Sequence, residues 1–328
     1  MNDLAPVRSV RFALLATLLA FTACGPDFDS QAALDEGSGT DVAEGELKTL
    51  PSEDRATTLD VGSWNVEWFG SPDDGPLDDA LQQKNVTLVL QQLKLDLVGL
   101  VEVVDPAAFT RVVEQLPGYE GLLVTDPRVT DGTKYYSARE QKVALVFKSR
   151  FHVDSARVVV PEAAYNFGGR PPMEVTLSFT ENGAPRTLVV VVAHFKAMAN
   201  YDGWNRRTLA SASYKAWLDA TYARRWVLTI GDWNDDLDVS TYQHRLSPFS
   251  NFVGDATRYS FTTQALTASN TSTTATFGST IDHHMATAAL ATRFQAGSAK
   301  VVRPDVVVPN YALTTSDHYP VVTRYDLR

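Results

Sequence analysis

The stretch Arg225–Asp236, RWVLTIGDWNDD, runs from an apolar segment directly into Asp232, Asn234 and two further acids. Its Trp, Val, Leu, Thr and Ile residues are typical of a buried β-strand. A Gly-Asp pair is also ordinary turn chemistry, so the acids could simply mark a surface loop. The rest of the sequence decides between a plain loop and a functional site at a strand end.

Polar side chains recur at the ends of other apolar segments. Asn65 follows LDVGSW, His194 closes LVVVVAH, and Asp317 and His318 precede YPVV. Glu102 lies inside VGLVEVVD, where burying a carboxylate is costly unless it is paired or binds a cation. Several such residues at strand edges predict one shared cleft. Oxygen-rich side chains of this kind favour Mg²⁺, with Mn²⁺ or Ca²⁺ as alternatives, over zinc.

Strand-like and helix-like segments alternate from Thr58 onward. LDLVGLVEVV is almost continuously apolar, as expected for a strand in a sheet that is covered on both faces. Pro106 stands at a helix-start position, and Asn182-Gly183 between two apolar segments is a strong hairpin signal. The sequence shows no internal repeat and no domain boundary within 58–328. We therefore expect one α/β domain with two packed mixed β-sheets rather than a doubly wound parallel sheet.

Seven short motifs follow one another along this domain, in the order WNVEWF, LVEV, GRPP, AHFKA, GDWND, TIDHH and SDHYPV. This order resembles the endonuclease/exonuclease/phosphatase superfamily, which includes DNase I-like nucleases, apurinic endonucleases, neutral sphingomyelinases and inositol-phosphate phosphatases. Each motif alone is a weak signal, but the seven in order cover essentially all of 58–328. The resemblance implies a four-layer sandwich, in which helices flank two packed mixed β-sheets and the site lies at one end.

The resemblance also implies roles for the acidic and amide residues. Asn65, Glu102 and Asp317 would lie in or beside the metal shell, with Glu102 as the principal ligand. Asp232 and Asn234 would hold and activate the water that attacks phosphorus. RWVLTIGDWNDD is then a core strand that delivers catalytic groups, which is the functional alternative to a surface loop.

Two histidines and two arginines complete the site that the resemblance implies. His318, oriented by Asp282, would bind a phosphoryl oxygen and act in acid–base catalysis, and His194 would act on the other side of the phosphate. Arg170, in GGRPP, either approaches the phosphate or is a structural turn arginine. Arg207, near the start of a helix after YDGW, could reach a scissile or flanking phosphate.

These residues predict an enzyme, a divalent-metal-dependent phosphoesterase. Hydrolysis of a phosphate ester places negative charge on the phosphoryl and leaving oxygens, and cations and histidines stabilise that charge. A nuclease that acts on DNA or RNA is the preferred interpretation. A sphingomyelinase-like or inositol-phosphate-cleaving enzyme is the first alternative, although no exposed apolar hairpin or large insertion for a membrane is evident. A non-catalytic binding lipoprotein is the second alternative, and it would predict a broken site where this one is complete.

Charge is unevenly distributed along the 328 residues, whose formal net charge is −10. Residues 25–57 contain nine acidic side chains against Lys48 and Arg55, and few apolar ones, which predicts a flexible acidic linker. In the catalytic domain, Asp235 and Asp236 are expected to be solvent-facing turn acids. The overall charge neither supports nor excludes a nucleic-acid substrate.

The N-terminus has the layout of an export signal. Two arginines precede an apolar run from Phe12 to Phe21, which is too short to span a membrane, and small residues then lead to Cys24. Residues 1–24 therefore predict a signal peptide with a lipobox-like end, at which Cys24 would be lipidated; an ordinary cleaved signal is the alternative. We expect an exported, monomeric protein of the bacterial cell envelope that contacts the membrane only through this anchor, or a secreted protein if Cys24 is not lipidated.

Overall fold

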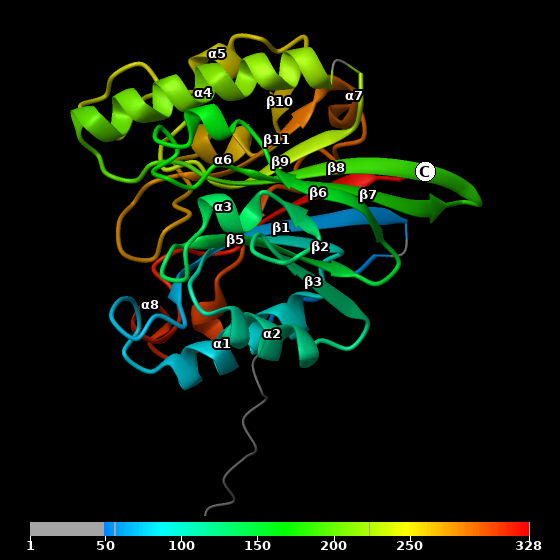
Figure 1. The fold of residues 1–328 in the computed structure, drawn as a ribbon, viewed down its shortest axis with the longest axis vertical. Coiled ribbons are helices and arrows are strands. Elements are labelled where there is room, and N and C mark those ends of the chain that lie inside the picture. Colours follow the sequence, from blue (N-terminus) through cyan, green and yellow to red (C-terminus); the bar gives the residue numbers. More distant parts are fainter. Residues whose placement is uncertain (1–48, 56, 223, 328) are drawn as a thin grey trace, which may run out of the picture. The chain divides into compact units, whose positions relative to one another are not determined.

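The computed structural model describes residues 49–55, 57–222 and 224–327, which form the fold drawn in Figure 1. The predicted signal peptide, Cys24 and most of the predicted linker lie outside the described residues. Within the described part of the chain, no helix has both the length and the apolar character needed to cross a membrane.

Six strands form the first sheet, in the order β12-β13-β1-β2-β5-β3. Their bounds are β1 Thr58–Phe69, β2 Leu97–Val103, β3 Tyr119–Leu123, β5 Lys142–Lys148, β12 Lys300–Val301 and β13 Val321–Asp326. Strands β1 and β2 are parallel, and the other neighbours are antiparallel. The sheet is therefore mixed.

Seven strands form the second sheet, in the order β10-β11-β9-β8-β7-β6-β4. Their bounds are β4 Val129–Thr130, β6 His152–Val158, β7 Met173–Glu181, β8 Ala184–His194, β9 Val227–Asp232, β10 Tyr259–Phe261 and β11 Asp282–Thr287. This sheet is also mixed, since β8 pairs with β9 and β4 with β6 in parallel. The predicted hairpin joins β7 to β8 at Asn182-Gly183, where both residues have positive φ.

Helices cover the outer faces of both sheets. Their bounds are α1 Asp79–Leu93, α2 Pro106–Glu114, α3 Gly132–Tyr135, α4 Tyr201–Thr221, α5 Ser250–Val253, α6 Gln264–Ala268, α7 Ala288–Ala291 and α8 Tyr311–Thr314, with 3₁₀ turns at Pro161–Ala163 and Pro304–Val306. Figure 1 shows α1 and α2 against the first sheet and α4 and α5 against the second. The prediction of a four-layer sandwich is confirmed.

Strand β2 shows why a continuous apolar run suits this architecture. Leu97 and Val101 pack into the core between the two sheets, while Val98 and Leu100 pack against the core under α1 and α2. Because successive side chains of a strand point to opposite faces, burial on both faces requires apolar residues at consecutive positions. The same reason explains the apolar runs of β8 and β9.

The parallel pairing of β8 and β9 brings two predicted site residues together, because the carboxyl ends of both strands lie at one edge. The register places His194 opposite Asp232. Gly231, just before Asp232, has φ +136, and a Cβ at this position would lie 2.1 Å from the carbonyl oxygen of Ala193. Only glycine therefore fits at this point of the TIGDWNDD stretch.

The boundary predicted between linker and domain at residue 57 is wrong. Leu50 is buried, and the backbone N–H of Glu53 donates a 2.8 Å hydrogen bond to the carbonyl of Leu93. The buried carboxylate of Glu53 accepts a 2.9 Å bond from Arg324 and also pairs with Lys300. Composition marks this segment as acidic and solvated, but its charge is neutralised by cations about 250 residues further along the chain.

Candidate functional site

Five of the predicted site residues line a cleft at the strand ends remote from the β7–β8 hairpin, which projects to the right in Figure 1; they are Glu102, Asp232, Asn234, Asp317 and His318. The cleft has a volume of about 360 Å³. Its lining combines acids, an amide and His318 with apolar and hydroxyl side chains: Glu102, Ala197, Met198, Ala199, Asp232, Asn234, Thr241, Phe277, Ser279, Ile281, Asp317 and His318. Loops after β8 and β9 and the segment before β13 supply most of it.

Asn65 joins the buried carboxylate of Asp232 to the partly exposed carboxylate of Glu102. Its side-chain Nδ2 donates to Glu102 Oε1 at 2.9 Å and to Asp232 Oδ2 at 3.1 Å. Its Oδ1 accepts a 2.9 Å bond from the backbone N–H of Glu67, which fixes the amide orientation. One residue of β1 thus links the end of β2 to the end of β9, across the two sheets.

Glu102 occupies a strained position that aims its carboxylate into the cleft. Its φ is +67, and the pairing of β2 with β5 is interrupted at this point. A positive φ is uncommon for a residue with a side chain and is typical of functional sites. The second carboxylate oxygen accepts a 3.1 Å bond from the N–H of Trp68. Burial raises the pKa of Glu102, although the hydrogen bond from Asn65 opposes this shift.

Asp317 is the most exposed of the three residues predicted to lie in or beside the metal shell, with a side chain 31% exposed. Its backbone N–H donates a 2.8 Å bond to Glu67 Oε2. Burial, and then the charge of Asp317, raises the pKa of Glu67 to about 7. Glu67 is not among the predicted site residues, although its place two residues after Asn65 in WNVEWF was a usable signal.

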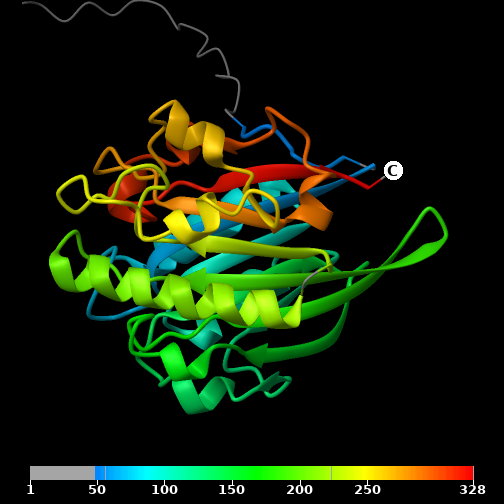
Figure 2. The same cartoon turned by 90° about the horizontal axis from the view of Figure 1, so that it is seen from above.

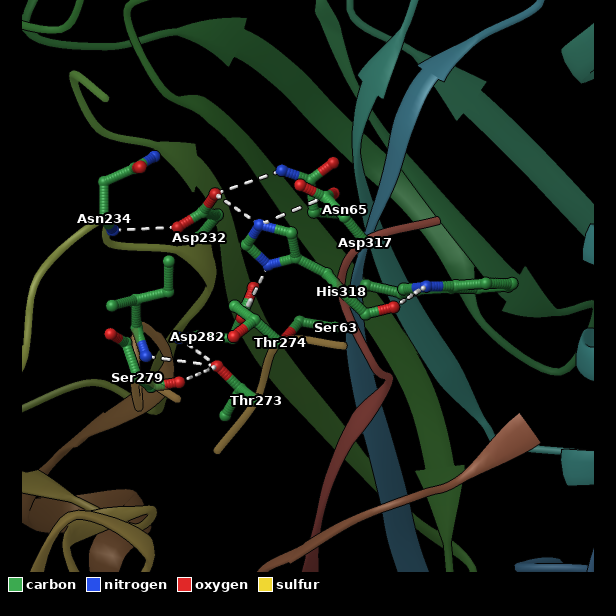
Figure 3. Close-up of polar contacts among 12 residues, drawn as sticks. Ser63, Asn65, Asp232, Asn234, Thr273, Thr274, Ser279, Asp282, Asp317 and His318 are labelled. Atoms are coloured by element: carbon green, nitrogen blue, oxygen red, sulfur yellow. Dashed lines mark hydrogen bonds and ion pairs between the residues drawn. The ribbon is translucent and has the colours of Figure 1, made fainter. Parts of the chain in front are cut away.

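His318 and Asp282 form a buried pair beside Asp232. His318 Nδ1 lies 2.8 Å from Asp282 Oδ2, and its Nε2 lies 3.9 Å from both Asp232 Oδ2 and Asp317 Oδ1, as Figure 3 shows for this group. Burial alone lowers the pKa of His318, but the carboxylates of Asp282 and Asp232 outweigh it and raise this pKa well above its usual value. The two carboxylates therefore favour the protonated form of His318.

Asp232 is the last residue of β9, and Asn234 lies in the loop that follows it. Asp232 Oδ1 accepts a 2.8 Å bond from the backbone N–H of Asn234, whose φ is +56. Asn234 Nδ2 donates to the carbonyl of Phe195 at 3.1 Å. Burial, and then the neighbouring charge of Asp282, raises the pKa of Asp232 to about 7.

His194 is completely enclosed, yet neither ring nitrogen has a hydrogen-bond partner among the described residues. Its Nε2 lies 3.6 Å from Glu102 Oε1 and 3.7 Å from Asp232 Oδ2. Burial, and then the positive charge of Arg170, lowers the pKa of His194 well below its usual value. Burial therefore favours the neutral ring, which points an unsatisfied nitrogen at the two carboxylates.

The two arginines predicted to bind phosphate have different surroundings. Arg170 is 8% exposed, donates to the side chain of Gln141, and has a buried Nε without a partner among the described residues. The positive charge of Arg170 lies close enough to Glu102 and His194 to act on the pKa of each residue. Arg170 therefore contributes to the electrostatics of the site. Either predicted role, phosphate contact or structural arginine, stays open for Arg170.

The prediction that Arg207 reaches a phosphate is wrong. Arg207 is fully buried, and its Nε and Nη2 donate to Asp235 Oδ2 at 3.0 and 2.9 Å. Its Nη1 donates to the carbonyls of Lys196 and Met198 at 2.7 and 3.1 Å. Asp235, expected in solvent, is also fully buried. The pair ties the loop after β8 to the loop after β9.

His283 and His284, which follow Asp282, are both buried away from this chemistry. His283 lies within hydrogen-bond distance of Thr263 and of the carbonyl of Asp235, and His284 lies between Thr323 and Ser63. Each histidine therefore has two partners within the fold.

Within the described ranges, two groups of side chains could hold a divalent cation. The ligand atoms of Glu102, His194 and Asp232 lie within 4.8 Å of one another, and so do those of Asp232, Asp282 and His318. In the first group, burial disfavours the charged forms of both carboxylates, so a cation beside Glu102 would offset that cost. The residues at this end of the cleft fit a divalent ion.

Comparison with known proteins agrees with this geometry. The model of the family described as Endonuclease/Exonuclease/phosphatase matches residues 62–318. No curated protein matches the chain.

Solved structures share the fold at low sequence identity. A D. rerio TDP2 complexed with single strand DNA product has a TM-score of 0.60 at 15% identity, covering 82% of this chain and 99% of that one. The human Nocturnin catalytic domain with bound sulfate anion has a TM-score of 0.55 at 18% identity, with 83% and 94% covered. An endonuclease/exonuclease/phosphatase from Beutenbergia cavernae has a TM-score of 0.57 at 21% identity, with 83% and 72% covered.

Proposed function

The chain belongs to the Endonuclease/Exonuclease/phosphatase family and is a metal-dependent phosphoesterase, and on this premise we propose that it hydrolyses phosphodiester bonds of DNA or RNA. The observation that carries the proposal is the convergence of Asp232, His318 and Glu102 on one cleft, each held by a fixed partner. A TDP2 structure with the same fold is described with a single strand DNA product. That likeness supports a nucleic-acid substrate for this chain.

We assign the metal to the end of the cleft at Glu102 and Asn65, with Asp317 beside it. Mg²⁺ is the proposed ion because the donors are mostly oxygens, and Mn²⁺ and Ca²⁺ are the alternatives. When bound, such an ion offsets negative charge on the phosphoryl oxygens. Glu102 is the principal ligand in this proposal, since its backbone strain and its bonds from Asn65 and Trp68 hold one carboxylate orientation.

Asp232 acts as the general base in this mechanism. Its carboxylate accepts a proton from the attacking water, while bonds from Asn65 and from the N–H of Asn234 keep the two oxygens oriented. Asn234 then holds the water in line with phosphorus through its side chain. A pKa of about 7 suits a base that works near neutral pH.

The two histidines act on the phosphoryl group in different protonation states. His318, protonated and oriented by Asp282, donates from Nε2 to a phosphoryl oxygen and stabilises the charge that develops there. His194, which is neutral, contributes a hydrogen bond from the opposite side. Because His318 is the histidine whose pKa is raised, it is also the candidate donor to the leaving oxygen.

The substrate is tested with the purified full chain on supercoiled plasmid, single-stranded RNA, sphingomyelin and an inositol phosphate. Each reaction is run with Mg²⁺, with chelator, and with His318→Ala as the control for contaminating enzymes. We expect Mg²⁺-dependent cleavage of nucleic acid that the variant loses. Turnover of lipid or inositol phosphate with intact nucleic acid would replace the nuclease proposal by the corresponding alternative. Turnover of none of the four would favour the binding lipoprotein.

We propose that the enzyme acts outside the cytoplasm, anchored through Cys24, on the basis of the signal-like residues 1–24. The full chain expressed in a bacterium should incorporate a labelled fatty acid, and Cys24→Ser should abolish this labelling. Equal labelling of both chains would rule out Cys24 as the lipidation site. Export without labelling would leave an ordinary cleaved signal.

A further inference from the structure

Two exposed and two half-buried side chains form an aromatic and cationic surface at the start of α4. The guanidinium carbon of Arg245 lies 5.7, 5.0 and 5.3 Å from the ring centroids of Tyr201, Trp204 and Tyr242. The Tyr201 and Trp204 rings lie 5.9 Å apart, and Tyr201 is 56% exposed. We call these four residues the aromatic platform.

The platform is held in place by its own backbone connections. Asn200 caps α4 through a 2.8 Å bond to a backbone N–H of the first turn. Trp204 Nε1 donates to the carbonyl of Leu246 at 3.0 Å, which joins the helix to the turn at 241–246. The N–H of Arg245 closes that turn onto the carbonyl of Tyr242 at 3.2 Å. These bonds fix the two backbone segments and the Trp204 ring, so neither segment needs to rearrange when a ligand binds.

The charge of Arg245 is available to a ligand. Among the residues that the structure describes, no carboxylate pairs with Arg245, whereas nearby Arg206 pairs with Asp202 at 3.3 Å. Arg245 is instead stabilised by the ring faces beneath it. A flat guanidinium that lies over aromatic rings and has free donors can bind both a phosphate and the face of a base.

The platform adjoins the cleft directly. Thr241 lines the cleft, and the next residue is Tyr242. Met198, 62% exposed, also lines it and lies three residues before Tyr201. Figures 1 and 2 show that α4 begins at the end of the molecule where β8 ends. A chain bound with one phosphodiester in the cleft can therefore extend onto the platform.

A further aromatic ring, outside the platform, lines the cleft itself. Phe277 is 46% exposed and meets the His318 ring edge-on, with centroids 6.2 Å apart. The cleft and the platform together thus offer separated apolar faces along one surface. This arrangement is typical of proteins that stack successive bases of a single strand.

We propose that the aromatic platform binds unpaired bases of a single-stranded nucleic acid whose neighbouring phosphodiester occupies the cleft. The inference rests on the proposed nuclease function and specifies its substrate as single-stranded or locally opened. In a duplex the base faces are stacked on one another, so rings on a protein surface have no base face to contact. Tyr, Trp and Arg are also enriched at membrane interfaces, and a lipid surface is therefore the competing occupant that the test must exclude.

The test measures binding of a fluorescent single-stranded 12-mer to the full chain in chelator, where no cleavage occurs. We expect Tyr201→Ala and Arg245→Ala each to raise Kd about 5- to 100-fold, the range for losing one stacked base. Tyr201→Phe keeps the ring and should restore binding, which excludes misfolding. Arg303→Ala is the matched control, because Arg303 also lies over a tyrosine ring, at 4.1 Å, but does not line the cleft.

Catalysis supplies a second measurement. In the platform variants, kcat/KM for the 12-mer should fall at least fivefold further than kcat/KM for bis(4-nitrophenyl) phosphate, which is too small to reach the platform. Equal effects on the two substrates, or wild-type 12-mer affinity in both alanine variants, would overturn the proposal. So would equal affinity for a duplex, or a selective loss of binding to anionic phosphatidylglycerol vesicles. Failure of the wild type to cleave any nucleic acid while the platform still binds the 12-mer would count against the nuclease function alone.

Discussion

Replacing Asp282 by asparagine is expected to lower kcat on a phosphodiester substrate by about 10²- to 10⁴-fold near neutral pH. The amide keeps the size of the carboxylate but not its charge, and Asp282 Oδ2 lies 2.8 Å from His318 Nδ1. Loss of an orienting carboxylate behind a catalytic histidine has effects of this order. The measurement is a steady-state assay, with thermal unfolding to verify that the variant is folded.

The pH dependence gives this prediction a definite sign. The charges of Asp282 and Asp232 raise the pKa of His318 well above its usual value, so the protonated ring, and activity with it, is retained at neutral pH and lost as pH rises through that pKa. Asp232 must be ionised to act as base, so activity falls below its pKa of about 7. Without Asp282 both pKa values decrease, because one ring loses an attractive charge and one carboxylate loses a repulsive charge. The pH optimum of Asp282→Asn should therefore move to lower pH.

A control variant separates this effect from a general loss of charge. Asp305→Asn removes an exposed carboxylate that pairs with Arg303 at 3.5 Å and does not line the cleft, so its activity profile should match the wild type. An unchanged kcat in Asp282→Asn, or a lower kcat with an unshifted optimum, would contradict the role of Asp282 as the residue that charges and orients His318.

The clustering of the candidate residues could be predicted because polar residues interrupt or end apolar strands. His194 and Asp232 close two strands that pair in parallel, so the register alone brings them together, while Glu102 stands out as a carboxylate inside an apolar strand. The four-layer architecture follows equally from consecutive buried positions, as in β2. Features that follow from the alternation of apolar and polar residues along one strand can therefore be predicted from the sequence alone.

Long-range pairing is not readable in this way. In the sequence, Glu53 cannot be distinguished from the other acids of a solvated linker. In the fold, Arg324 from the other end of the chain lies 2.9 Å from its carboxylate. Arg206 and Arg207 are adjacent on α4, and successive helical residues point about 100° apart. The two side chains therefore have different surroundings. Arg207 is fully buried, whereas Arg206 donates to the carbonyl of Tyr165 and pairs with Asp202, and their order in the sequence does not show which arginine takes which place.

Breaking the buried Arg207–Asp235 pair is expected to cost about 3–5 kcal/mol of the free energy of unfolding, the usual effect of leaving one buried charge without its partner. Asp235→Ala leaves the Arg207 guanidinium buried without its carboxylate and with two carbonyl acceptors. Arg207→Met leaves the Asp235 carboxylate buried without its cation, although it still accepts bonds from Ser240 and from the N–H of Thr241. Urea unfolding measures the loss, and the double variant should lose much less than the sum of the single ones.

Two comparisons decide what this loss means. Arg128→Ala, which removes an exposed pair with Asp126, should cost about 1 kcal/mol or less. If Arg207 bound phosphate, Arg207→Lys would raise KM and leave stability nearly unchanged. In the observed fold the opposite holds, because lysine lacks the fork that reaches Asp235 and two carbonyls together. Arg207→Lys should therefore lower the free energy of unfolding. Any decrease in kcat should come only from greater mobility of the loops that carry Met198 and Asn234.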